Sequence, residues 1–534
     1  MLTGEDGRSS VDVVRAGLAP RFSLALSGRS RTLRQTWLDT FDWRLYQARF
    51  TLEHRTASGL SDYLLSSGNG EQLTVSARSV RWPGMAGALP PGPLRDRLAG
   101  LAWVRALLPV ARATSTVRQL RVLNDDLKTI ALLTVNQLAV PGPGAAPPQA
   151  RLLVTAIRGY QAQTGWIIRA LTETAGLVPA TCSALETALA AAGRRPGDYT
   201  GKVDLQLTAA MPASRAVTEV LLQLADTLQA NVPGTIRDTD TEFLHDLRVA
   251  VRRTRSALKL CGDALTAGTQ QRYAGEFKWL GDITTPVRDL DVYLLGYDQS
   301  ADGLLAATAA ELAPFHAHLC RQRETERAAL VRALRSRRFA GLMAAWRRDL
   351  GSQAAPRRGP AAGQLAAGRI HRAYRRVLGP GSRIGPGSPP ESLHDLRKRC
   401  KELRYLLEFF ASLHDPAIHR QAVRDLKGLQ DCLGEYQDCQ VQLHELRMFA
   451  RQMRTDRRVP ATALLAMGEL AGQLGQRETE ARSEFAGRFV PKQSDQVRVR
   501  VFDPARSAAF DERLRLGVRR AFVRTVRLRH RPSR

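Results

Sequence analysis

The sequence predicts a multidomain fold: an α+β, antiparallel-barrel-like N-terminal domain followed by an all-α domain of two pseudo-twofold-related four-helix bundles. Three observations predict it. The chain has 534 residues, too many for one ordinary core, and 44% are hydrophobic, enough to build more than one. Strand patterns stop near residue 210, where helical patterns replace them. Blocks of the helical region then recur in the same order, 149 residues further along.

The N-terminal region, residues 1–210, carries short runs that alternate apolar and polar residues between Gly, Asn and Pro. These runs predict strands at 21–26, 35–40, 49–54, 62–67, 71–77, 128–140 and 150–157. Helices are predicted at 94–108 and 159–176. Strands with a few helices indicate an antiparallel α+β domain.

The region 211–490 reads as helical, because its apolar residues recur at three-to-four spacing. Linkers rich in Pro and Gly interrupt it at 351–363 and 379–392. The last stretch, 491–534, is a basic, Arg-rich C-terminal segment.

An internal repeat organises this helical region. FLHDLRVAVRRTRSALKL begins at Phe243 and SLHDLRKRCKELRYLLEF begins at Ser392. FKWLGDITTPVRDLDVYL and LKGLQDCLGEYQDCQVQL follow at the same offset of 149 residues. Several blocks in order at one offset predict two copies of a helical unit, about 215–350 and 365–490, each with about four helices.

The charge balance limits the functions that fit the chain. It has 79 Lys and Arg against 51 Asp and Glu, a formal net charge of +28. Such an excess favours a polyanionic partner: nucleic acid, inorganic polyphosphate or an anionic surface. The sequence shows no apolar run long enough for a membrane span, no secretion signal and no CxxC pair among its six cysteines. We therefore expect a cytoplasmic protein with reduced thiols and no cofactor.

Basic residues form a stripe on one helix of each copy. In the first copy they lie at His245, Arg248, Arg252, Arg255 and Lys259; the second copy has His394, Arg397, Lys401 and Arg404. The steps are three and four, and the apolar set sits one residue earlier, about 100° away, so the stripe borders the buried face. A solvated helix face is the alternative. Few acids lie on the stripes to pair with them, and the pattern occurs twice, which favours anion binding.

Other polar residues of the repeats are better explained by structure. Asp282, Asp431, Asp289 and Asp438 are expected to cap helices or orient arginines. No spacing of His, Cys and Asp resembles a closed metal site, so no metal ligand is predicted.

HDLRVAVRRTRSALKL (245–260) and HDLRKRCKELRYLLEFF (394–410) resemble the paired helices of the CHAD domain, the conserved histidine α-helical domain. The resemblance covers about 211–490. It implies two pseudo-symmetric four-helix bundles that present a basic surface to inorganic polyphosphate, and an association with polyphosphate granules. Position 402 is Glu where the first copy has Arg253, so the halves differ in charge. The anion contacts implied by matching position are the nine stripe residues, with Lys278 and Lys427 as additions; His371, Arg372, Arg375 and Arg376 on a neighbouring helix are further candidates.

The N-terminal domain resembles the CYTH domain, the triphosphate tunnel fold, through TWLDTFDWRLYQARFTLEHR (36–55) and weaker later segments. Active CYTH members carry an ExExK strand whose carboxylates face into the tunnel and hold a divalent metal. The corresponding segment here, RFSLALSG (21–28), has no acidic residue, and Glu53 is the one glutamate of TLEHR. We therefore predict no catalytic residues and no enzyme activity in this domain.

Three functions from different classes remain. The leading one is binding of inorganic polyphosphate, with other polyanions as further ligands, in the cytoplasm or at polyphosphate granules. The second is a metal-dependent triphosphatase or polyphosphatase of the CYTH type. The third is nonspecific nucleic-acid binding; the stripes lack the interleaved aromatic residues that stack on bases, so nucleic acid is not expected as a specific ligand.

Overall fold

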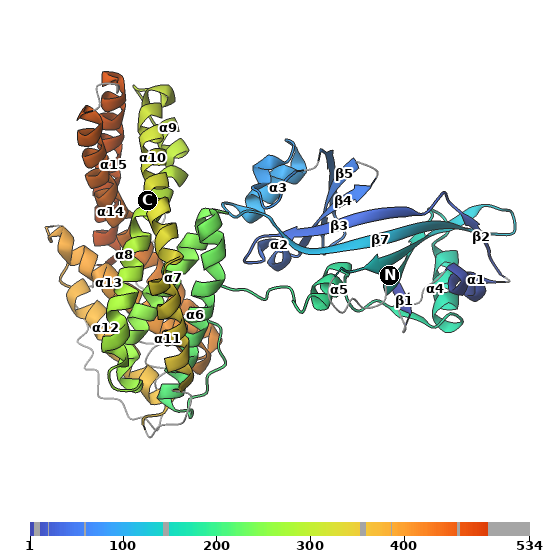
Figure 1. Cartoon of the computed structure of the whole chain (residues 1–534), viewed down its shortest axis with the longest axis horizontal. Helices are drawn as coiled ribbons and strands as arrows, with labels where there is room; N and C mark the ends of the chain where they lie inside the picture. Colours follow the sequence, from blue (N-terminus) through green and yellow to red (C-terminus); the bar gives the residue numbers. More distant parts are fainter. Residues whose placement is uncertain are drawn as a thin grey trace, which may run out of the picture. The chain divides into compact units, whose positions relative to one another are not determined.

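The computed structural model describes residues 1–4, 11–19, 21–57, 60–78, 80–141, 149–352, 359–385, 387–455 and 460–489. The chain divides into two compact units, Met1–Thr200 and Gly201–Arg534 (Figure 1). The sequence had placed this boundary about ten residues later, at 210. The basic segment 491–534 lies outside the described residues.

An antiparallel ten-stranded sheet forms the N-terminal unit. Its order is β10-β1-β9-β8-β7-β3-β4-β5-β6, and β2 also pairs with β7. The antiparallel α+β architecture is confirmed, although the sheet is open within the described residues, since its end strands β10 and β6 do not pair with each other. The strands are β1 (Leu2–Gly4), β2 (Ser23–Leu26), β3 (Arg31–Asp39), β4 (Phe50–Ala57), β5 (Leu60–Ser67), β6 (Gln72–Ala77), β7 (Leu108–Leu123), β8 (Thr129–Ala139), β9 (Gln149–Ala156) and β10 (Leu177–Pro179).

Helices cover this sheet at separate places, so the unit has more than one core. One core lies between the sheet and α1 and α4, and another lies beneath α3 (Figure 1). A third packs the two buried tryptophans Trp37 and Trp43 against α5. The helices are α1 (Val11–Leu18), α2 (Arg44–Gln47), α3 (Pro93–Ala102), α4 (Gln161–Glu173) and α5 (Ala184–Ala191).

The predicted helix 94–108 is wrong in its second half. It ends at Ala102, and the long central strand β7 begins at Leu108. The buried side chains of this strand include Ala111, Ala113 and Ser115, which are small and partly polar. Alternation of such residues gives a weak strand signal, because strand patterns are read from large apolar side chains.

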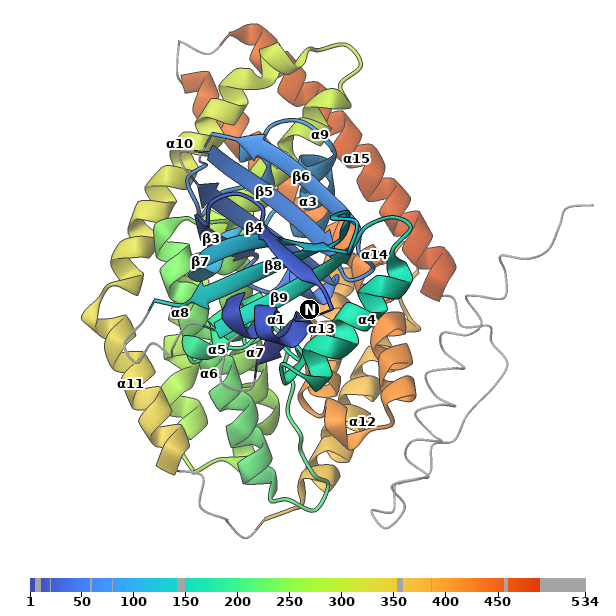
Figure 2. The ribbon, with the colours of Figure 1, turned by 90° about the vertical axis from the view of Figure 1, so that its right-hand side faces the viewer.

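The helices of the second unit make up its regular secondary structure within the described residues, as predicted, apart from an isolated bridge between Pro212 and Ala361. The first copy holds α6 to α11 and the second holds α12 to α15. Figure 2 shows the first copy, in green and yellow, mainly on one side of the unit and the second, in orange and red, on the other. The bounds are α6 (Ala213–Arg237), α7 (Thr241–Cys261), α8 (Thr269–Leu295), α9 (Tyr297–Asp302), α10 (Ala309–Leu334), α11 (Arg337–Ser352), α12 (Ala362–Gly381), α13 (Pro390–Phe409), α14 (Pro416–Thr455) and α15 (Ala461–Phe489).

Hydrogen bonds between the copies reveal a pseudo-twofold axis. The backbone N–H of Ala213 donates to the carbonyl of Pro360 at 3.0 Å, and that of Ala362 donates to the carbonyl of Met211 at 2.8 Å. Each residue of one bond is 149 positions from its counterpart in the other, so the two bonds are images of each other. The axis therefore passes between the starts of α6 and α12.

Two hydrophobic cores hold the helical unit together. The larger includes residues of both copies, among them Leu247 on α7 and Leu396 on α13, and so joins the repeats. The smaller lies where α9, α10, α14 and α15 rise above the rest of the unit in Figure 1. At its edge the hydroxyl of Tyr293 on α8 donates to the carbonyl of Gln442 on α14, a residue 149 positions away. The pseudo-twofold axis therefore also passes between α8 and α14.

Candidate functional site

The basic stripes lie on α7 and α13, as the sequence predicted. The side chain of Asp240 caps α7 by accepting the backbone N–H groups of Glu242 and Phe243. From this start, Leu244, Leu247 and Val251 point into the large core. The stripe borders that core: the side chains of His245, Arg248 and Arg252 are half-buried, and those of Arg255 and Lys259 are exposed.

Helix α8 runs antiparallel to α7 and supplies neutral partners for one stripe residue. Nη1 of Arg248 donates to the hydroxyl of Thr285 at 2.7 Å and to that of Thr284 at 3.3 Å. The guanidinium of Arg255 lies over Gly281 of α8, since a Cβ at this position would be 3.1 Å from its Nη1. The hydroxyl groups that accept from Arg248 are neutral and do not themselves neutralise its positive charge.

The second copy repeats this arrangement on α13 and α14. Nη2 of Arg397 lies 3.1 Å from Oδ1 of Asp438, and Nδ1 of His394 lies 2.6 Å from Oε1 of Gln437. Asp289, the counterpart of Asp438, likewise acts on Arg248 through its charge. The expectation that these aspartates orient arginines is therefore met for Asp438.

Five of the predicted cations form what we call the central cationic cluster: Arg248, Arg252, Arg397, Lys401 and Arg404. Arg252 and Lys401 occupy equivalent positions in the two copies, and their charges interact. Arg252 also interacts with Arg248, and Lys401 interacts with Arg397 and Arg404. The cluster therefore crosses the pseudo-twofold axis and combines cations from both copies.

Crowding of like charges perturbs this cluster. Burial, with the nearby guanidinium groups of Arg397 and Arg252, lowers the pKa of Lys401 to about 7. Burial is also the main cause that lowers the pKa of Arg248 to about 10, and Asp289 opposes the shift. Uncompensated positive charge in a partly desolvated site stabilises a bound anion more than solvated charge does.

Several donors of the cluster have no protein acceptor. The buried Nε atoms of Arg252 and Arg397 make no hydrogen bond within the part of the chain that the structure describes. Lys401 makes neither a hydrogen bond nor an ion pair with any described residue. Buried polar groups are normally satisfied, so these donors point to a ligand with oxygen acceptors.

Lys259 has an acidic partner that the sequence analysis did not assign. Its Nζ lies 2.5 Å from Oε1 of Glu402 on α13, and Nη2 of Arg253 lies 2.7 Å from Oε2 of Glu408. Arg253 and Glu402 are equivalent positions, as are Lys259 and Glu408. The two ion pairs are images of each other with reversed charge, which ties α7 to α13. The opposite charges at these equivalent positions are visible in the aligned copies, but their pairing depends on the packing of α7 against α13.

The remaining predicted contacts lie outside the cluster. Lys278 is exposed and lies 3.5 Å from the carboxylate of Asp282, although it shares the α8 face of Gly281 and Thr285. Its counterpart Lys427 on α14 is exposed as well.

Four further candidates, on α12, are not brought to the cluster. Nη1 of Arg399 donates to the carbonyl of Arg376 at 3.4 Å, so α12 contacts α13 there. Arg399 is two residues after Arg397 and thus about 200° further round the helix. This contact places α12 against a different side of α13 from the cluster. The four residues are His371, Arg372, Arg375 and Arg376.

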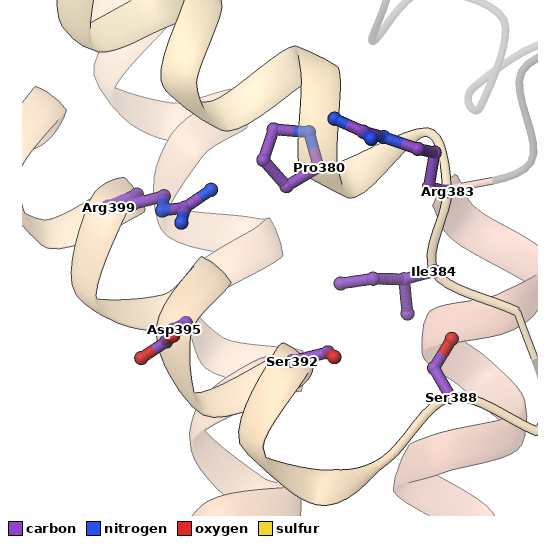
Figure 3. A pocket seen from close by; sticks show the side chains of 7 residues that line it. All are labelled: Pro380, Arg383, Ile384, Ser388, Ser392, Asp395 and Arg399. Atoms are coloured by element: carbon purple, nitrogen blue, oxygen red, sulfur yellow. The ribbon is translucent and has the colours of Figure 1, made fainter.

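A separate pocket lies where α12 ends and α13 begins (Figure 3). Its volume is about 260 Å³, and it is lined by Pro380, Arg383, Ile384, Ser388, Ser392, Asp395 and Arg399. Arg399 and Ile384 approach it from opposite sides in Figure 3. Its charges are mixed, since two arginines and one aspartate contribute. It is therefore less strongly cationic than the central cluster.

In the N-terminal unit, Glu53 is held by protein groups. It is 8% exposed, and it accepts Nε and Nη2 of Arg55 at 2.9 and 2.8 Å as well as the amide of Gln35. Among the described residues, no group of three or more His, Cys, Asp or Glu could hold a metal ion.

The acids of the segment 36–55 shape its backbone. Asp39 accepts the backbone N–H groups of Thr40, Leu45 and Tyr46, and burial raises its pKa to about 6. This carboxyl fixes the turn that leads into α2. The role was not predicted, because it depends on backbone donors that a sequence pattern does not show.

Residues 219–447 match the family model of the CHAD domain. This part of the chain is a CHAD domain. It contains α7, α8, α12 and α13 in full, and with them the central cationic cluster. Searched over its described residues, the structure has no helix long and apolar enough to span a membrane.

Three solved structures resemble the chain. The CHAD domain from the plant Ricinus communis is 26% identical, with 53% of this chain and 95% of that chain covered and a TM-score of 0.47. PptA from Streptomyces chartreusis is 17% identical, with coverages of 51% and 98% and a TM-score of 0.41. HpAC1 from Hippeastrum, described as a putative adenylyl cyclase with a dominant triphosphatase activity, is 12% identical, with coverages of 35% and 93% and a TM-score of 0.23. These TM-scores are too low to carry a functional argument. No curated protein matches the chain.

Proposed function

We propose that this protein binds inorganic polyphosphate at the central cationic cluster of its CHAD domain. The observation that carries the proposal is the meeting of α7 and α13 cations at the pseudo-twofold axis, with buried Nε atoms of Arg252 and Arg397 unpaired. Guanidinium groups grip phosphate oxygens bidentately, and an ammonium group adds a point charge.

A polymeric anion fits this site better than a single phosphate. Equivalent cations from two copies face one axis, so a repeating ligand presents the same group to each half. Arg255, Lys278 and Lys427 are exposed near the cluster or on the continuing faces of α8 and α14 and would engage further phosphates. Many weak contacts along one flexible chain add avidity, and counterion release makes the binding salt-dependent.

The same proposal includes the location of the protein in the cell and its preference for polyphosphate over nucleic acid. Binding of long polyphosphate would bring the protein to polyphosphate granules in the cytoplasm. The cluster contains guanidinium and ammonium groups without exposed aromatic side chains between them, so bases gain no stacking platform. Nucleic acid would therefore bind through backbone charge alone.

We also infer that the N-terminal unit does not hydrolyse phosphoanhydrides. What supports this is the carboxylate of Glu53, which is nearly buried and already engaged by Arg55 and Gln35. A carboxylate used in this way offers little to the divalent metal that CYTH-type hydrolysis requires.

The experiment measures binding of the full chain to long-chain polyphosphate at near-physiological salt, with duplex DNA as competitor at equal phosphate concentration. Phosphate release is followed in the same samples with Mg²⁺ or Mn²⁺. We expect tight binding that DNA does not displace, and no released phosphate. Displacement by DNA would make the site a general polyanion surface, and released phosphate would support the enzyme alternative.

A matched pair of double variants locates the site. Arg252→Gln with Lys401→Gln removes two cluster cations that have no partner among the described residues, so the fold should tolerate the change. Lys398→Gln with Arg332→Gln removes the same charge at two exposed positions that belong to neither basic stripe. We expect roughly a hundredfold loss of affinity for the first and less than about threefold for the second. Equal losses would refute the cluster as the binding site.

A further inference from the structure

Lys401 differs from the other lysines of the helical unit in its surroundings. It is half-buried and lies one helical turn from Arg397 and Arg404 on α13, at the position equivalent to Arg252 on α7. The ion pairs Arg253–Glu408 and Lys259–Glu402, at 2.7 and 2.5 Å, hold these two helices together beside it. Its charge interacts with those of Arg397, Arg252 and Arg404 and with the carboxylate of Asp438 on α14. Burial first, and then the three neighbouring guanidinium groups, disfavour an ammonium ion here, although Asp438 opposes the shift and Arg404 is paired with Glu408 at 3.3 Å. Arginine does not relieve such crowding by losing a proton at neutral pH, so the lysine does.

We propose that Lys401 is a reactive amine that acyl phosphates acylate, in competition with polyphosphate. The cluster supplies both requirements for such a reaction. A neutral amine is a nucleophile, and the surrounding guanidinium groups bind the phosphate of an anionic acyl donor. The pKa of about 7 at Lys401 supports the proposal, since a large fraction of the amine is then neutral at physiological pH.

The reaction needs no further reagent. The lone pair of Nζ attacks the carbonyl carbon of the acyl phosphate and forms the C–N bond. The bond from that carbon to the bridging oxygen breaks, and inorganic phosphate leaves with the electron pair. The amine loses one proton to water. Arg252, Arg397 and Arg404 stabilise the negative charge that develops on the departing phosphate.

Acylation would change the binding site. An amide carries no charge, so the cluster loses one cation and its single ammonium donor. The proposal rests on anion binding at the cluster, the basis of the proposed function. It predicts that acyl-phosphate levels tune polyphosphate affinity.

The test treats the full-length protein with acetyl phosphate at about pH 7.5 and follows acetylation of each lysine by peptide mass spectrometry. Lys398 is the matched internal control, because it lies on the same helix, is exposed and pairs with Asp395 at 3.4 Å. We expect the initial rate at Lys401 to exceed that at Lys398 by at least about tenfold. Long-chain polyphosphate should slow acetylation of Lys401 and leave Lys398 unchanged.

A second measurement uses Arg252→Gln, which removes one cation from the cluster. We expect the rate at Lys401 to fall several-fold, whereas a rate set by exposure alone would not change. Equal rates at Lys401 and Lys398 in the native protein would overturn the proposal. Polyphosphate binding is measured separately on unmodified protein, so rapid acetylation without polyphosphate binding would contradict the proposed function and leave the reactive lysine in place.

Discussion

At the scale of single residues, the cations of the cluster differ in what holds them. Arg248 is anchored by hydroxyl groups of α8, and Arg397 by Asp438. Arg252 and Lys401 have no such anchors among the described residues and face each other across the axis. These two are therefore the groups that gain most from a bound phosphate.

On the proposed function, Lys401 should make the affinity for polyphosphate depend on pH. Burial and its cationic neighbours lower its pKa to about 7, and a bound phosphate would raise that pKa again, so binding takes up a proton. Affinity should therefore fall as the pH rises from about 6 to about 8.5. Titrations across this range measure the effect.

Two variants isolate the contribution of Lys401. Lys401→Arg, which stays charged, should show a flatter pH profile than the native protein, and Lys398→Arg should keep the native slope. An unchanged slope in Lys401→Arg would assign the dependence to another group. The stability of the free protein depends on pH in the opposite direction to the affinity. The pKa of Lys401 in the folded protein lies below its unfolded value near 10.4, so the contribution of this residue to the free energy of unfolding rises with pH between about 7 and 10.

At the scale of elements, α7 and α13 recognise each other through charge. Arg253 pairs with Glu408, and the image pair joins Lys259 to Glu402 with the signs exchanged. Two identical copies would instead place like charges together at both sites. The reversal thus favours association of copy one with copy two over self-association of either copy.

Reversing one charge in this interface should destabilise the helical unit. Arg253→Glu sets two carboxylates against each other at a site where Arg253 is only 8% exposed, so we expect a loss of about 3 kcal/mol in the free energy of unfolding. Adding Glu408→Arg should recover at least half of it. Denaturant unfolding of the native protein, of Arg253→Glu, of Glu408→Arg and of the double variant measures the coupling; a double variant no more stable than Arg253→Glu would show that charge pairing is not the cause.

A close approach between α6 and α7 gives a second test. Gly234 lies so close to Phe243 that an added Cβ would overlap the phenyl ring, which is buried in the core. Gly234→Ala should therefore cost about 2 kcal/mol or more through overpacking. The matched control is Gly368→Ala in α12, where a Cβ meets open space and helix propensity predicts a gain of about 0.5 kcal/mol. Thermal unfolding distinguishes them, and equal shifts would argue against the clash.

The sequence predicts those helices and strands in which apolar side chains recur at regular spacing. The helices of both copies and most strands fall in this class, as does the placing of the stripes beside the core. The sequence does not predict strand β7, because the buried positions in its first half, Ala111, Ala113 and Ser115, hold small side chains. The meeting of Arg252 with Lys401, and the pairing of Lys259 with Glu402, follow from how the copies pack. A periodicity within one helix contains no information about its partner.

At the scale of the whole molecule, the net charge of +28 raises a question of specificity. A chain with this excess attracts any polyanion at low salt, so affinity alone does not identify a site. Many described Lys and Arg side chains outside the cluster are exposed, where salt screens them well, whereas the central cluster is partly shielded from solvent. The two contributions should therefore respond differently to salt and to mutation.

The salt dependence of binding distinguishes the contribution of the central cluster from that of the exposed surface charge. The slope of log affinity against log salt counts the phosphate charges that the protein neutralises, at about 0.7 per contact for a single-stranded polyanion. Arg252→Gln with Lys401→Gln should lower the magnitude of this slope by about 1 to 2 and leave weak binding at low salt, because the remaining surface still attracts the polymer. Lys398→Gln with Arg332→Gln, with the same loss of charge, should change the slope by less than about 0.5. If both variants shift the slope equally, binding is set by total charge, and the alignment of two basic helices across the pseudo-twofold axis has no part in it.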